Sequence, residues 1–383
     1  MGAAAKILFV NHASRLSGAE LVLLDVAKSF RGGSAFLFED GPLRSALAAV
    51  GITPIVPAAG AGFTSIKRDR SLWRALPHLG GLVRTLARLV ATARRFDVIY
   101  ANSQKAFALA GPACAIARRP LIWHLHDILS PEHFGSGQIK LTIQLANRFA
   151  TRVIVPSQAC ADAFTAAGGK GALLRIVPNG LDDTHANARS MSAVALGLAP
   201  DTKLIFGVFS RLAPWKGQAV ALHALQAVPE AGCIIAGGAL FGEDDYARSL
   251  VTLAADLGVS DRVRFLGQRD DVPVLMRSVD AVVHPSVDPE PFGRTLVEAM
   301  LARRPVIAAH AGAVPEILDD GRVGLMFPPG DDVALAACLR QVLSGATDAL
   351  LDPAEERARS VYSAKRMRDG IEAVVAEVLP TRR

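Results

Sequence analysis

The alternation of short apolar runs with helical stretches constrains the fold of this chain more than any other feature. The runs are bounded by turn-forming residues, as buried strands are, and helical periodicity fills the intervals between them. Strands that alternate with helices form parallel sheets with helices on both faces. Because the alternation restarts in the second half, the sequence predicts an α/β protein with two doubly wound, Rossmann-like domains.

The predicted strands fall into two sets within a chain of 383 residues, a length that itself indicates more than one domain. The first set is Lys6–Asn11, Ala35–Phe38, Ile52–Val56, Asp97–Asn102, Leu121–His126, Arg152–Pro156 and Leu174–Pro178. The second set is Leu204–Phe209, Gly232–Ala236, Val263–Leu266, Ala281–Val283, Val306–Ala309 and Gly324–Phe327. Ligands of such sheets bind at the carboxyl ends of the strands, so functional residues are expected just after these runs.

The cysteine pattern indicates a reducing compartment. Cys114, Cys160, Cys233 and Cys338 lie far apart without a C-x-x-C pair, which signals neither a zinc site nor a disulfide framework. The start, MGAAAKILFV, runs directly into a strand pattern, and no uncharged apolar run approaches the roughly eighteen residues that a membrane span needs. The sequence therefore predicts a cytoplasmic protein without a secretory leader or an integral membrane segment.

Two glutamates and a helix start lie close together in the segment His284–Ile317, which reads as strand, loop, helix and strand. Glu290 lies in the loop and Glu298 lies within the helix predicted over Thr295–Ala302. The amides of Phe292–Thr295 would be at the helix start, where unpaired N–H groups attract an anion. Carboxylates accept hydrogen bonds from sugar hydroxyls, and amide donors suit phosphate. The segment therefore suits a molecule that carries both groups, a nucleotide sugar.

Two cations follow the first strand of the second set. Arg211 and Lys216 lie five residues apart in a loop that begins at Ser210. Most loop cations are solvated, but a strand's carboxyl end is where a ligand would bind. A diphosphate leaving group gains negative charge as a glycosidic bond breaks, and paired Arg and Lys stabilise that charge.

These segments resemble the signature of glycosyltransferase family 4, the group 1 retaining glycosyltransferases of B-type fold. The family pattern has Pro-Ser, then Glu, one residue, Phe-Gly, and a second Glu followed by Ala-Met. The matching residues here are Pro285-Ser286, Glu290, Phe292-Gly293 and Glu298-Ala299-Met300. The spacing from Arg211 to Lys216-Gly217 also matches a family motif of Arg, four residues and Lys-Gly.

The resemblance implies a retaining, metal-independent hexosyltransferase whose nucleotide-sugar donor is a substrate rather than a cofactor. In the family, the first glutamate contacts the donor sugar and the second contacts the ribose, roles that would fall on Glu290 and Glu298. Arg211 and Lys216 would stabilise the leaving diphosphate, and His126 would border the reacting carbon. The expected catalytic residues are therefore His126, Arg211, Lys216 and Glu290.

The resemblance also suggests further donor-binding residues. The loop before the helix predicted over Leu21–Phe30 reads Ser17-Gly18-Ala19-Glu20 where the family usually has Gly-Gly-Ala-Glu, which leaves Gly18 for close approach. Gly267 lies where family members hold the nucleotide base through backbone groups. The full expected donor-binding set is Gly18, Ser210, Arg211, Lys216, Gly267, Glu290, Phe292, Gly293, Thr295 and Glu298.

Two histidines end a predicted strand and point to the same face, because side chains alternate along a strand. His124 and His126 could suggest a metal, but no third ligand of suitable spacing is visible, so no metal is expected. From the residues alone, a structural histidine bonded to backbone stays open as an alternative. The family often carries His followed by Asp or Glu here, which corresponds to His126.

Family resemblance further implies domains that face each other across a cleft. Residues 1–180 would form the acceptor-side domain and residues 181–360 the donor domain. Val177-Pro178-Asn179-Gly180 resembles the family crossover, and the polar stretch up to Asp201 would be a linker. A helix over Val361–Leu379, within residues 361–383, would pack back on the first domain.

The charge distribution is uneven. Residues 1–180 hold 21 Lys+Arg and 9 Asp+Glu, whereas residues 181–383 hold 21 and 27. Eight of the basic residues lie in the amphipathic segment 66–96. They are Lys67, Arg68, Arg70, Arg74, Arg84, Arg88, Arg94 and Arg95. This segment could lie on an anionic inner-membrane surface, or it could be a solvated helix packed by its leucines; no nucleic-acid-binding module is visible.

The predicted function is transfer of a sugar to a saccharide or lipid-linked acceptor in cell-surface polysaccharide or glycolipid assembly. A nucleotide-sugar epimerase of related two-domain fold remains an alternative, as does a non-catalytic sugar-nucleotide-binding subunit. The absence of G-x-G-x-x-G disfavours a dehydrogenase. The base, the sugar and the acceptor cannot be identified from these motifs.

Overall fold

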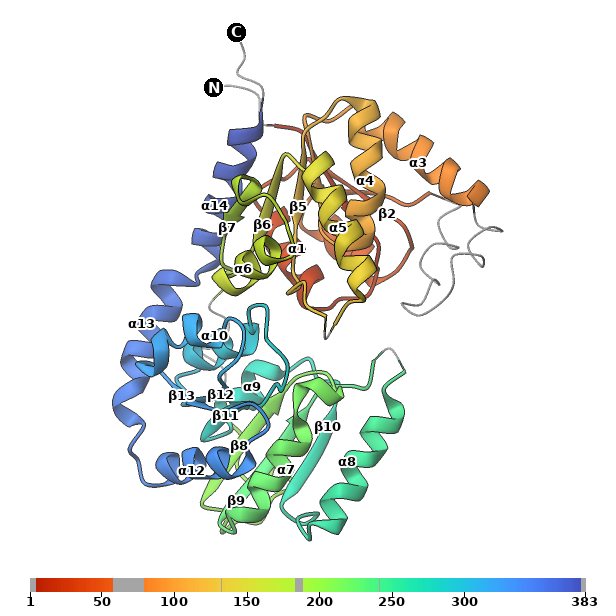
Figure 1. Ribbon diagram of the computed structural model, residues 1–383. Coiled ribbons are helices and arrows are strands. Elements are labelled where there is room, and N and C mark those ends of the chain that lie inside the picture. Colours follow the sequence, from red (N-terminus) through yellow and green to blue (C-terminus); the bar gives the residue numbers. More distant parts are fainter. Residues whose placement is uncertain (1–4, 58–78, 132, 183–188, 241, 380–383) are drawn as a thin grey trace. The chain divides into compact units, whose positions relative to one another are not determined.

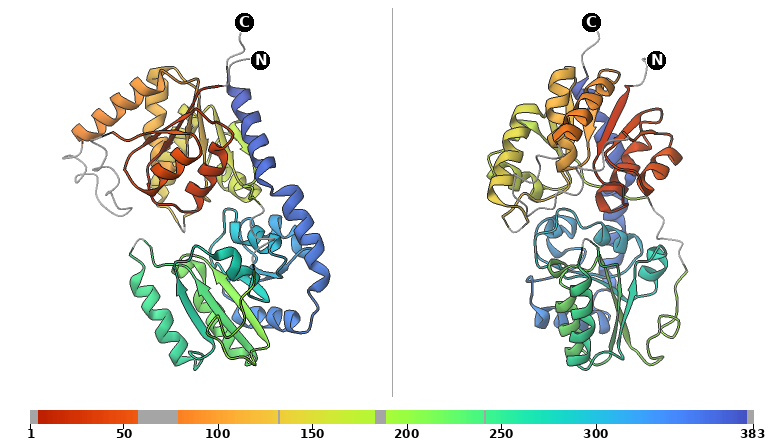
Figure 2. Two further views of the ribbon diagram at one scale, coloured as in Figure 1. Left: turned by 180° about the vertical axis from the view of Figure 1, so that it is seen from behind. Right: turned by 90° about the vertical axis from the view of Figure 1, so that its right-hand side faces the viewer.

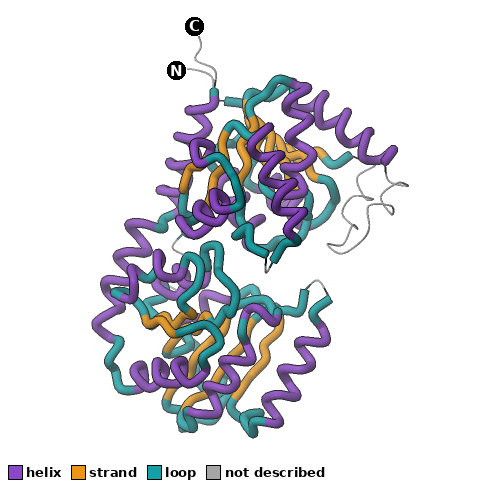
Figure 3. The backbone as a smooth tube through the Cα atoms, in the orientation of Figure 1, coloured by secondary structure: helices purple, strands orange, loops and turns teal. Residues whose placement is uncertain are grey.

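The computed structural model describes residues 5–57, 79–131, 133–182, 189–240 and 242–379. The chain divides into two compact units. Unit 1 comprises Met1–Gly180 and Ala364–Arg383, and unit 2 comprises Leu181–Ser363. In both units the strands form an inner layer with helices outside it (Figure 3). Each unit is described by itself below.

Unit 1 contains a seven-stranded parallel sheet in the order β3-β2-β1-β4-β5-β6-β7. Its strands are β1 (Ile7–Asn11), β2 (Ser34–Leu37), β3 (Thr53–Ile55), β4 (Val98–Ala101), β5 (Leu121–His124), β6 (Arg152–Val155) and β7 (Leu174–Ile176). Its helices are α1 (Gly18–Ala27), α2 (Pro42–Ala49), α3 (Leu79–Ala93), α4 (Gln104–Ala117), α5 (Ser136–Phe149), α6 (Gln158–Ala166), the 3-10 turn η3 (Gly171–Leu173) and α14 (Ala364–Val378). Figure 1 labels most of these elements.

Both faces of this sheet are buried, because alternate strand residues enter two separate cores. One core includes Leu8 and Trp123 and is covered by α3, α4, α5 and α6. The other includes Phe9 and Tyr100 and is covered by α1, α2 and α14. Figure 2 shows α14, coloured blue, running along unit 1 in both views. The last helix of the chain thus completes the core of the first unit.

Unit 2 contains a six-stranded parallel sheet in the order β10-β9-β8-β11-β12-β13. Its strands are β8 (Leu204–Phe209), β9 (Ala231–Ala236), β10 (Val263–Gly267), β11 (Ala281–His284), β12 (Val306–Ala309) and β13 (Leu325–Phe327). Its helices are η4 (Pro214–Lys216), α7 (Gln218–Ala227), α8 (Asp244–Asp256), α9 (Val272–Arg277), α10 (Arg294–Leu301), α11 (Val314–Ile317), η5 (Asp319–Gly321), α12 (Asp332–Leu343), η6 (Asp348–Leu350) and α13 (Leu351–Val361). The prediction of two doubly wound sheets is confirmed.

Two helix boundaries differ from the sequence prediction. Helix α1 begins at Gly18 rather than Leu21, because Ser17 is extended and its carbonyl accepts the first helical hydrogen bond, from the Leu21 N–H at 2.9 Å. At the end of the chain, the helix predicted from Val361 is interrupted. Tyr362 has non-helical backbone angles and its buried ring packs edge-on against Phe292, so α14 begins only at Ala364.

The stretch up to Asp201 is not a free linker in its described part. Leu196 and Leu198 are buried in the core of unit 2, and the Met191 N–H donates to Ser278 Oγ at 2.7 Å. The polar composition of the stretch suggested a solvated linker, although two of its leucines pack into that core. The prediction of a linker there was therefore wrong for these residues, which belong to unit 2.

The basic segment 66–96 is described only from Leu79, so Lys67, Arg68, Arg70 and Arg74 lie outside the described residues. Within α3, Leu89 is buried, and Leu82 and Leu86 pack against the first core. Leu82, Leu86 and Leu89 therefore face the protein. In the described part of the chain, no single helix is long and apolar enough to cross a membrane; one sharply bent pair, α12 with Asp348–Val361, meets the criteria of length and composition.

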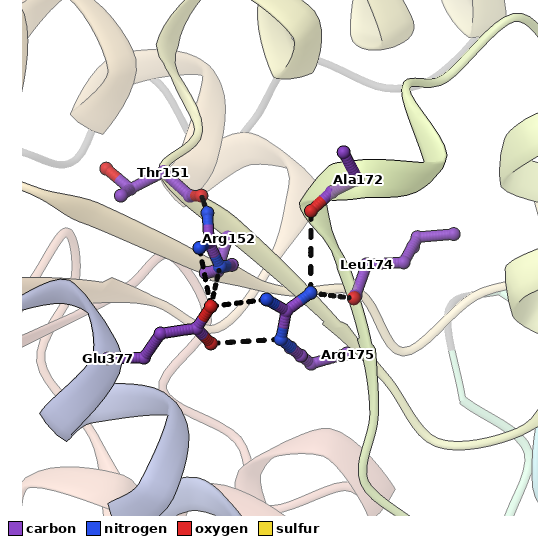
Figure 4. A network of polar contacts seen from close by, with 6 residues as sticks. All are labelled: Thr151, Arg152, Ala172, Leu174, Arg175 and Glu377. Atoms are coloured by element: carbon purple, nitrogen blue, oxygen red, sulfur yellow. Dashed lines mark hydrogen bonds and ion pairs between the residues drawn. The ribbon is translucent and has the colours of Figure 1, made fainter.

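An ionic network ties α14 to the edge of the first sheet (Figure 4). The Glu377 carboxylate accepts hydrogen bonds from Arg152 on β6, at 3.0 Å from Nε, and from Arg175 on β7, at 2.9 Å from Nε. Hydrogen bonds from the two guanidinium groups lower the pKa of Glu377 to about 2. One carboxylate thus links a helix to two neighbouring strands that precede it in the chain by about 200 residues.

We predict that Glu377→Gln lowers the melting temperature of the protein at neutral pH by a few degrees or less, since exposed ion pairs contribute little individually. The pKa of Glu377 is lowered from 4.5, so its contribution is present above that value and is lost as pH falls toward about 2. Thermal denaturation at several pH values measures this. The exposed Glu372 on the same helix provides the matched control, Glu372→Gln; equal effects of both changes would contradict the prediction.

Candidate active site

The candidate site lies where the strand order of the second sheet reverses. Strand β8 has β9 on one side and β11 on the other, so the loops that leave β8 and β11 diverge to opposite faces. Ligands of open α/β sheets bind at such switch points, outside the carboxyl ends of the strands. The loop after β8 carries Arg211 and Lys216, and the loop after β11 carries Glu290.

An ion pair joins these two loops. Lys216 Nζ lies 2.5 Å from Glu290 Oε2, and the two side chains are only 12% and 11% exposed. His284, at the end of β11, places Nε2 3.0 Å from the same oxygen and 3.1 Å from Ser286 Oγ. Thr295 Oγ1 lies 3.2 Å from the other ring nitrogen of His284. Five side chains from one strand, two loops and one helix therefore form a single polar cluster.

The carboxyl group of Glu290 is held in its ionised form. Burial opposes ionisation, but the Lys216 ammonium and the hydrogen bond from His284 outweigh it and hold the pKa of Glu290 well below its usual value. The stabilisation from this pair is therefore present above the ordinary glutamate pKa and is lost as pH falls through the lowered value. At neutral pH the site offers a fixed carboxylate beside a fixed cation.

Glycines allow the loops to come this close. Gly217 has a φ of 70°, and a Cβ atom there would lie 1.9 Å from the carbonyl oxygen of Pro285. The Val287 N–H donates to the Trp215 carbonyl at 2.9 Å. Gly312, with a φ of 62°, lies against the backbone of Glu290, and a Cβ atom added there would lie 2.3 Å from the Glu290 carbonyl oxygen. A side chain at Gly217 or Gly312 would push the Glu290 loop away.

Arg211 lies beside the ion pair. Its guanidinium is 5.3 Å from the centre of the Trp215 ring, and Lys216 Nζ is 4.0 Å from the same ring. Glu243, after β9, lies 3.2 Å from Arg211. The fully buried Gln218 donates to Ser210 Oγ and to the Arg211 carbonyl, each at 2.9 Å, and so fixes the start of this loop.

The remaining expected residues of unit 2 have separate partners. Glu298 lies 3.8 Å from Arg294, one turn earlier on α10, rather than in the Lys216 cluster. The Phe292 ring is buried against Tyr362, so only its backbone faces the helix start. Gly293 precedes α10 with a φ of 78°. Gly267 ends β10, is exposed, and accepts a hydrogen bond from the Gly237 N–H at 2.8 Å.

Unit 1 holds the other two expected residues. Gly18 is the first residue of α1, and no described atom lies within 4 Å of the position of an added Cβ. His126 follows β5 with Nε2 2.9 Å from Asn102 Oδ1. His124 is buried, with Nδ1 2.6 Å from the Tyr100 hydroxyl, and burial lowers its pKa well below the usual value. No group of three or more metal-ligating side chains occurs among the residues with described positions.

Sequence reasoning assigned no role to several residues of these clusters. They are Gln218, Glu243, Trp215 and His284. Two of them had a local signal: His284 ends a strand directly before Pro285-Ser286, and Glu243 lies in a stretch, 241–246, that resembles the family. The contact of Glu243 with Arg211 joins loops that follow different strands, and spacing along the chain does not reveal it.

Two doubly wound parallel sheets, one with a buried Lys–Glu pair at its switch point, agree with the GT-B class of glycosyltransferases, and comparisons with known proteins identify that class. The family described as glycosyl transferases group 1 matches residues 196–367, and the family described as Glycosyltransferase Family 4 matches residues 43–185. The chain belongs to this group 1, family 4 set of glycosyltransferases.

Solved structures support this assignment over nearly the whole chain. Anabaena HepE, solved in complex with UDP and glucose, is 38% identical, with a TM-score of 0.87 over 98% of this chain and 100% of HepE. HepE has also been solved in complex with UDP-glucose. Sucrose-phosphate synthase from Thermosynechococcus elongatus, at 18% identity and a TM-score of 0.80, shares the fold.

Two curated relatives align with this chain over only part of their own length. Phosphatidyl-myo-inositol mannosyltransferase of Mycobacterium leprae is 30% identical over 256 residues, which make up 65% of this chain and 64% of that enzyme. D-inositol 3-phosphate glycosyltransferase of Mycobacterium marinum is 32% identical over 188 residues, 40% of its length. The chain thus aligns with less than two thirds of either relative.

We predict that Lys216→Met lowers the free energy of unfolding by about 3 kcal/mol, because it leaves a buried carboxylate without its cation. Urea denaturation measures this. The double variant Lys216→Met/Glu290→Gln is expected to recover part of the loss, since a neutral amide still bonds His284 and Ser286. A single variant as stable as the wild type would show that the pair does not hold the loops together.

Proposed function

We propose that this protein is a retaining, metal-independent glycosyltransferase that moves a hexose from a nucleotide sugar to a saccharide or lipid-linked acceptor. Family membership supports sugar transfer. The HepE complexes, at up to 38% identity over nearly the full chain, favour UDP-glucose as the donor to test first. We place the reaction in cell-surface polysaccharide or glycolipid assembly; the lipid acceptor in the name of the Mycobacterium leprae relative supports the glycolipid choice.

The Lys216–Glu290 pair carries this proposal. Its 2.5 Å contact sets a cation beside a carboxylate at the switch point of the second sheet. The cation would stabilise charge that develops on the leaving diphosphate, and the carboxylate would accept hydrogen bonds from the sugar hydroxyls. Because both groups are already fixed, little reorganisation is needed during the reaction.

Further expected residues would complete the proposed donor site. The backbone amides at the start of α10, from Phe292 to Thr295, suit phosphate oxygens, and Glu298 would bind the ribose. Ser210 and Gly267 would contribute from the ends of β8 and β10, and Arg211 would share the diphosphate with Lys216. In unit 1, Gly18 would allow close approach of a ligand.

His126 of unit 1 is proposed to act at the donor sugar. The acceptor would be bound by unit 1, whose described and undescribed parts together carry an excess of basic residues. Exclusion of water around donor and acceptor would favour transfer over hydrolysis.

We predict that UDP-glucose raises the melting temperature more than GDP-glucose or ADP-glucose does, because a ligand that binds only the folded state stabilises it. Thermal-shift measurements with all three test this. Product analysis in EDTA, with and without glycolipid or oligosaccharide acceptors, then tests transfer. Conversion of the donor to its epimer without an acceptor would identify an epimerase, and no shift with any nucleotide sugar would contradict donor binding.

We predict that Arg211→Met lowers kcat about 100-fold to 1000-fold, since removal of one preorganised donor to a developing charge has this magnitude. The exposed Arg248 of α8 provides a matched control, and Arg248→Met should leave kcat unchanged. Steady-state kinetics with the identified donor measures both. Similar kinetics for the two variants would remove Arg211 from the proposed leaving-group site.

A further inference from the structure

A second polar cluster lies at the switch point of the first sheet, between β1 and β4. Asn11 ends β1, Asn102 follows β4 and His126 follows β5. The two asparagine side chains are fully buried. A buried amide must have its hydrogen bonds satisfied within the protein, so the partners of these amides define how each one is oriented.

The orientation of Asn102 follows from a backbone carbonyl. Its Nδ2 donates to the Ala19 carbonyl at 3.2 Å and to Asn11 Oδ1 at 3.3 Å. A carbonyl oxygen only accepts, so the NH2 group of Asn102 must face Ala19. Its Oδ1 therefore faces His126, with the Nε2 atom at 2.9 Å.

The hydrogen bonds of Asn11 independently require the same orientation of the Asn102 amide. Its Nδ2 donates to the Ala13 carbonyl at 2.8 Å and to Glu20 Oε1 at 3.1 Å. The other oxygen of the buried Glu20 accepts from Ser17. With its NH2 group bound to two acceptors, Asn11 presents Oδ1 to the NH2 group of Asn102. Reversing the amide of Asn102 would set its oxygen against two other oxygens.

The direction of this chain of hydrogen bonds determines which ring nitrogen of His126 carries a hydrogen. Since Asn102 Oδ1 only accepts, His126 Nε2 must carry a hydrogen, and in the neutral ring Nδ1 is then the acceptor. We propose that Asn102 is a positioning residue that holds His126 in the Nε2–H tautomer. Resting on the proposed function, His126 would accept a hydrogen bond from a sugar hydroxyl through Nδ1 rather than donate a proton to it.

His12, at the same edge of the sheet, differs from His126 because its partner does not fix its tautomer. Its Nδ1 lies 2.7 Å from the hydroxyl of Ser103, which can donate or accept. That contact leaves the tautomer of His12 undetermined. His124, whose ring centre is 4.0 Å from that of His126, is bonded to the Tyr100 hydroxyl in the same ambiguous way. Of these three histidines, His126 is the one facing an amide oxygen whose direction is set elsewhere.

Nitrogen-15 NMR of the full chain labelled at histidine tests the tautomer directly, without any ligand. His126→Gln identifies the His126 signals by their loss. We expect a protonated Nε2 and an unprotonated Nδ1 in the neutral ring. A proton on Nδ1 would overturn the proposal, whatever the protein transfers, so this result is independent of the proposed function.

Two substitutions separate positioning from a structural role. Asn102→Ala removes the acceptor and should give mixed tautomers and a kcat lower by roughly 10-fold to 100-fold. Asn102→Asp keeps an oxygen facing Nε2 and should therefore retain the Nε2 hydrogen, while its second oxygen faces the Ala19 carbonyl and Asn11 Oδ1 and should lower the melting temperature. Loss of the Nε2 hydrogen in Asn102→Asp, or an unchanged tautomer in Asn102→Ala, would overturn the proposal. If either variant does not fold, the wild-type spectrum still decides.

Discussion

The buried contact between Lys216 and Glu290 is the interaction on which the candidate donor site depends. Transfer of two charges out of water is unfavourable, and their attraction offsets it only when the remaining hydrogen-bonding capacity is satisfied. His284 and Ser286 contribute here, at 3.0 and 3.5 Å from Glu290 Oε2, the oxygen that Lys216 also contacts. The close approach of Gly217 to Pro285 brings the two loops near enough for the contact. The close packing of the two loop backbones and the attraction between Lys216 and Glu290 therefore stabilise the same contact.

Both sheets use their switch points, but for different chemistry. In the second sheet, loops from β8 and β11 meet through opposite charges. In the first, Asn11 at the end of β1, Asn102 after β4 and His126 after β5 meet through hydrogen bonds between two amides and an imidazole, with the Glu20 carboxylate at the far end of the chain of bonds. A charged pair suits a phosphate-bearing ligand. Under the proposal above, the directional amide network would fix the His126 ring and its proton.

Local periodicity made the strands predictable, because the central ones are apolar runs buried on both faces, whereas the edge strands β3 and β7 are only partly buried. Short motifs made Lys216 and Glu290 predictable, because their spacing is fixed along the chain. The neighbours of these residues were not predictable in the same way. Glu243 reaches Arg211 from the loop after a different strand, β9, and Leu196 and Leu198 enter the core from a stretch of polar composition. Such contacts depend on which strands are adjacent, and that order is set by the whole sheet.

The two cations of the site differ in how firmly they are held, and this difference divides their tasks under the proposed function. Lys216 is 12% exposed and paired with a residue of the site itself, whereas Arg211 is 31% exposed and paired with Glu243 from the loop after β9. Partly exposed pairs are weak and exchange readily for a stronger anion, whereas buried pairs persist. An incoming diphosphate would therefore displace Glu243 from Arg211, whereas Lys216 would contact the diphosphate without releasing Glu290.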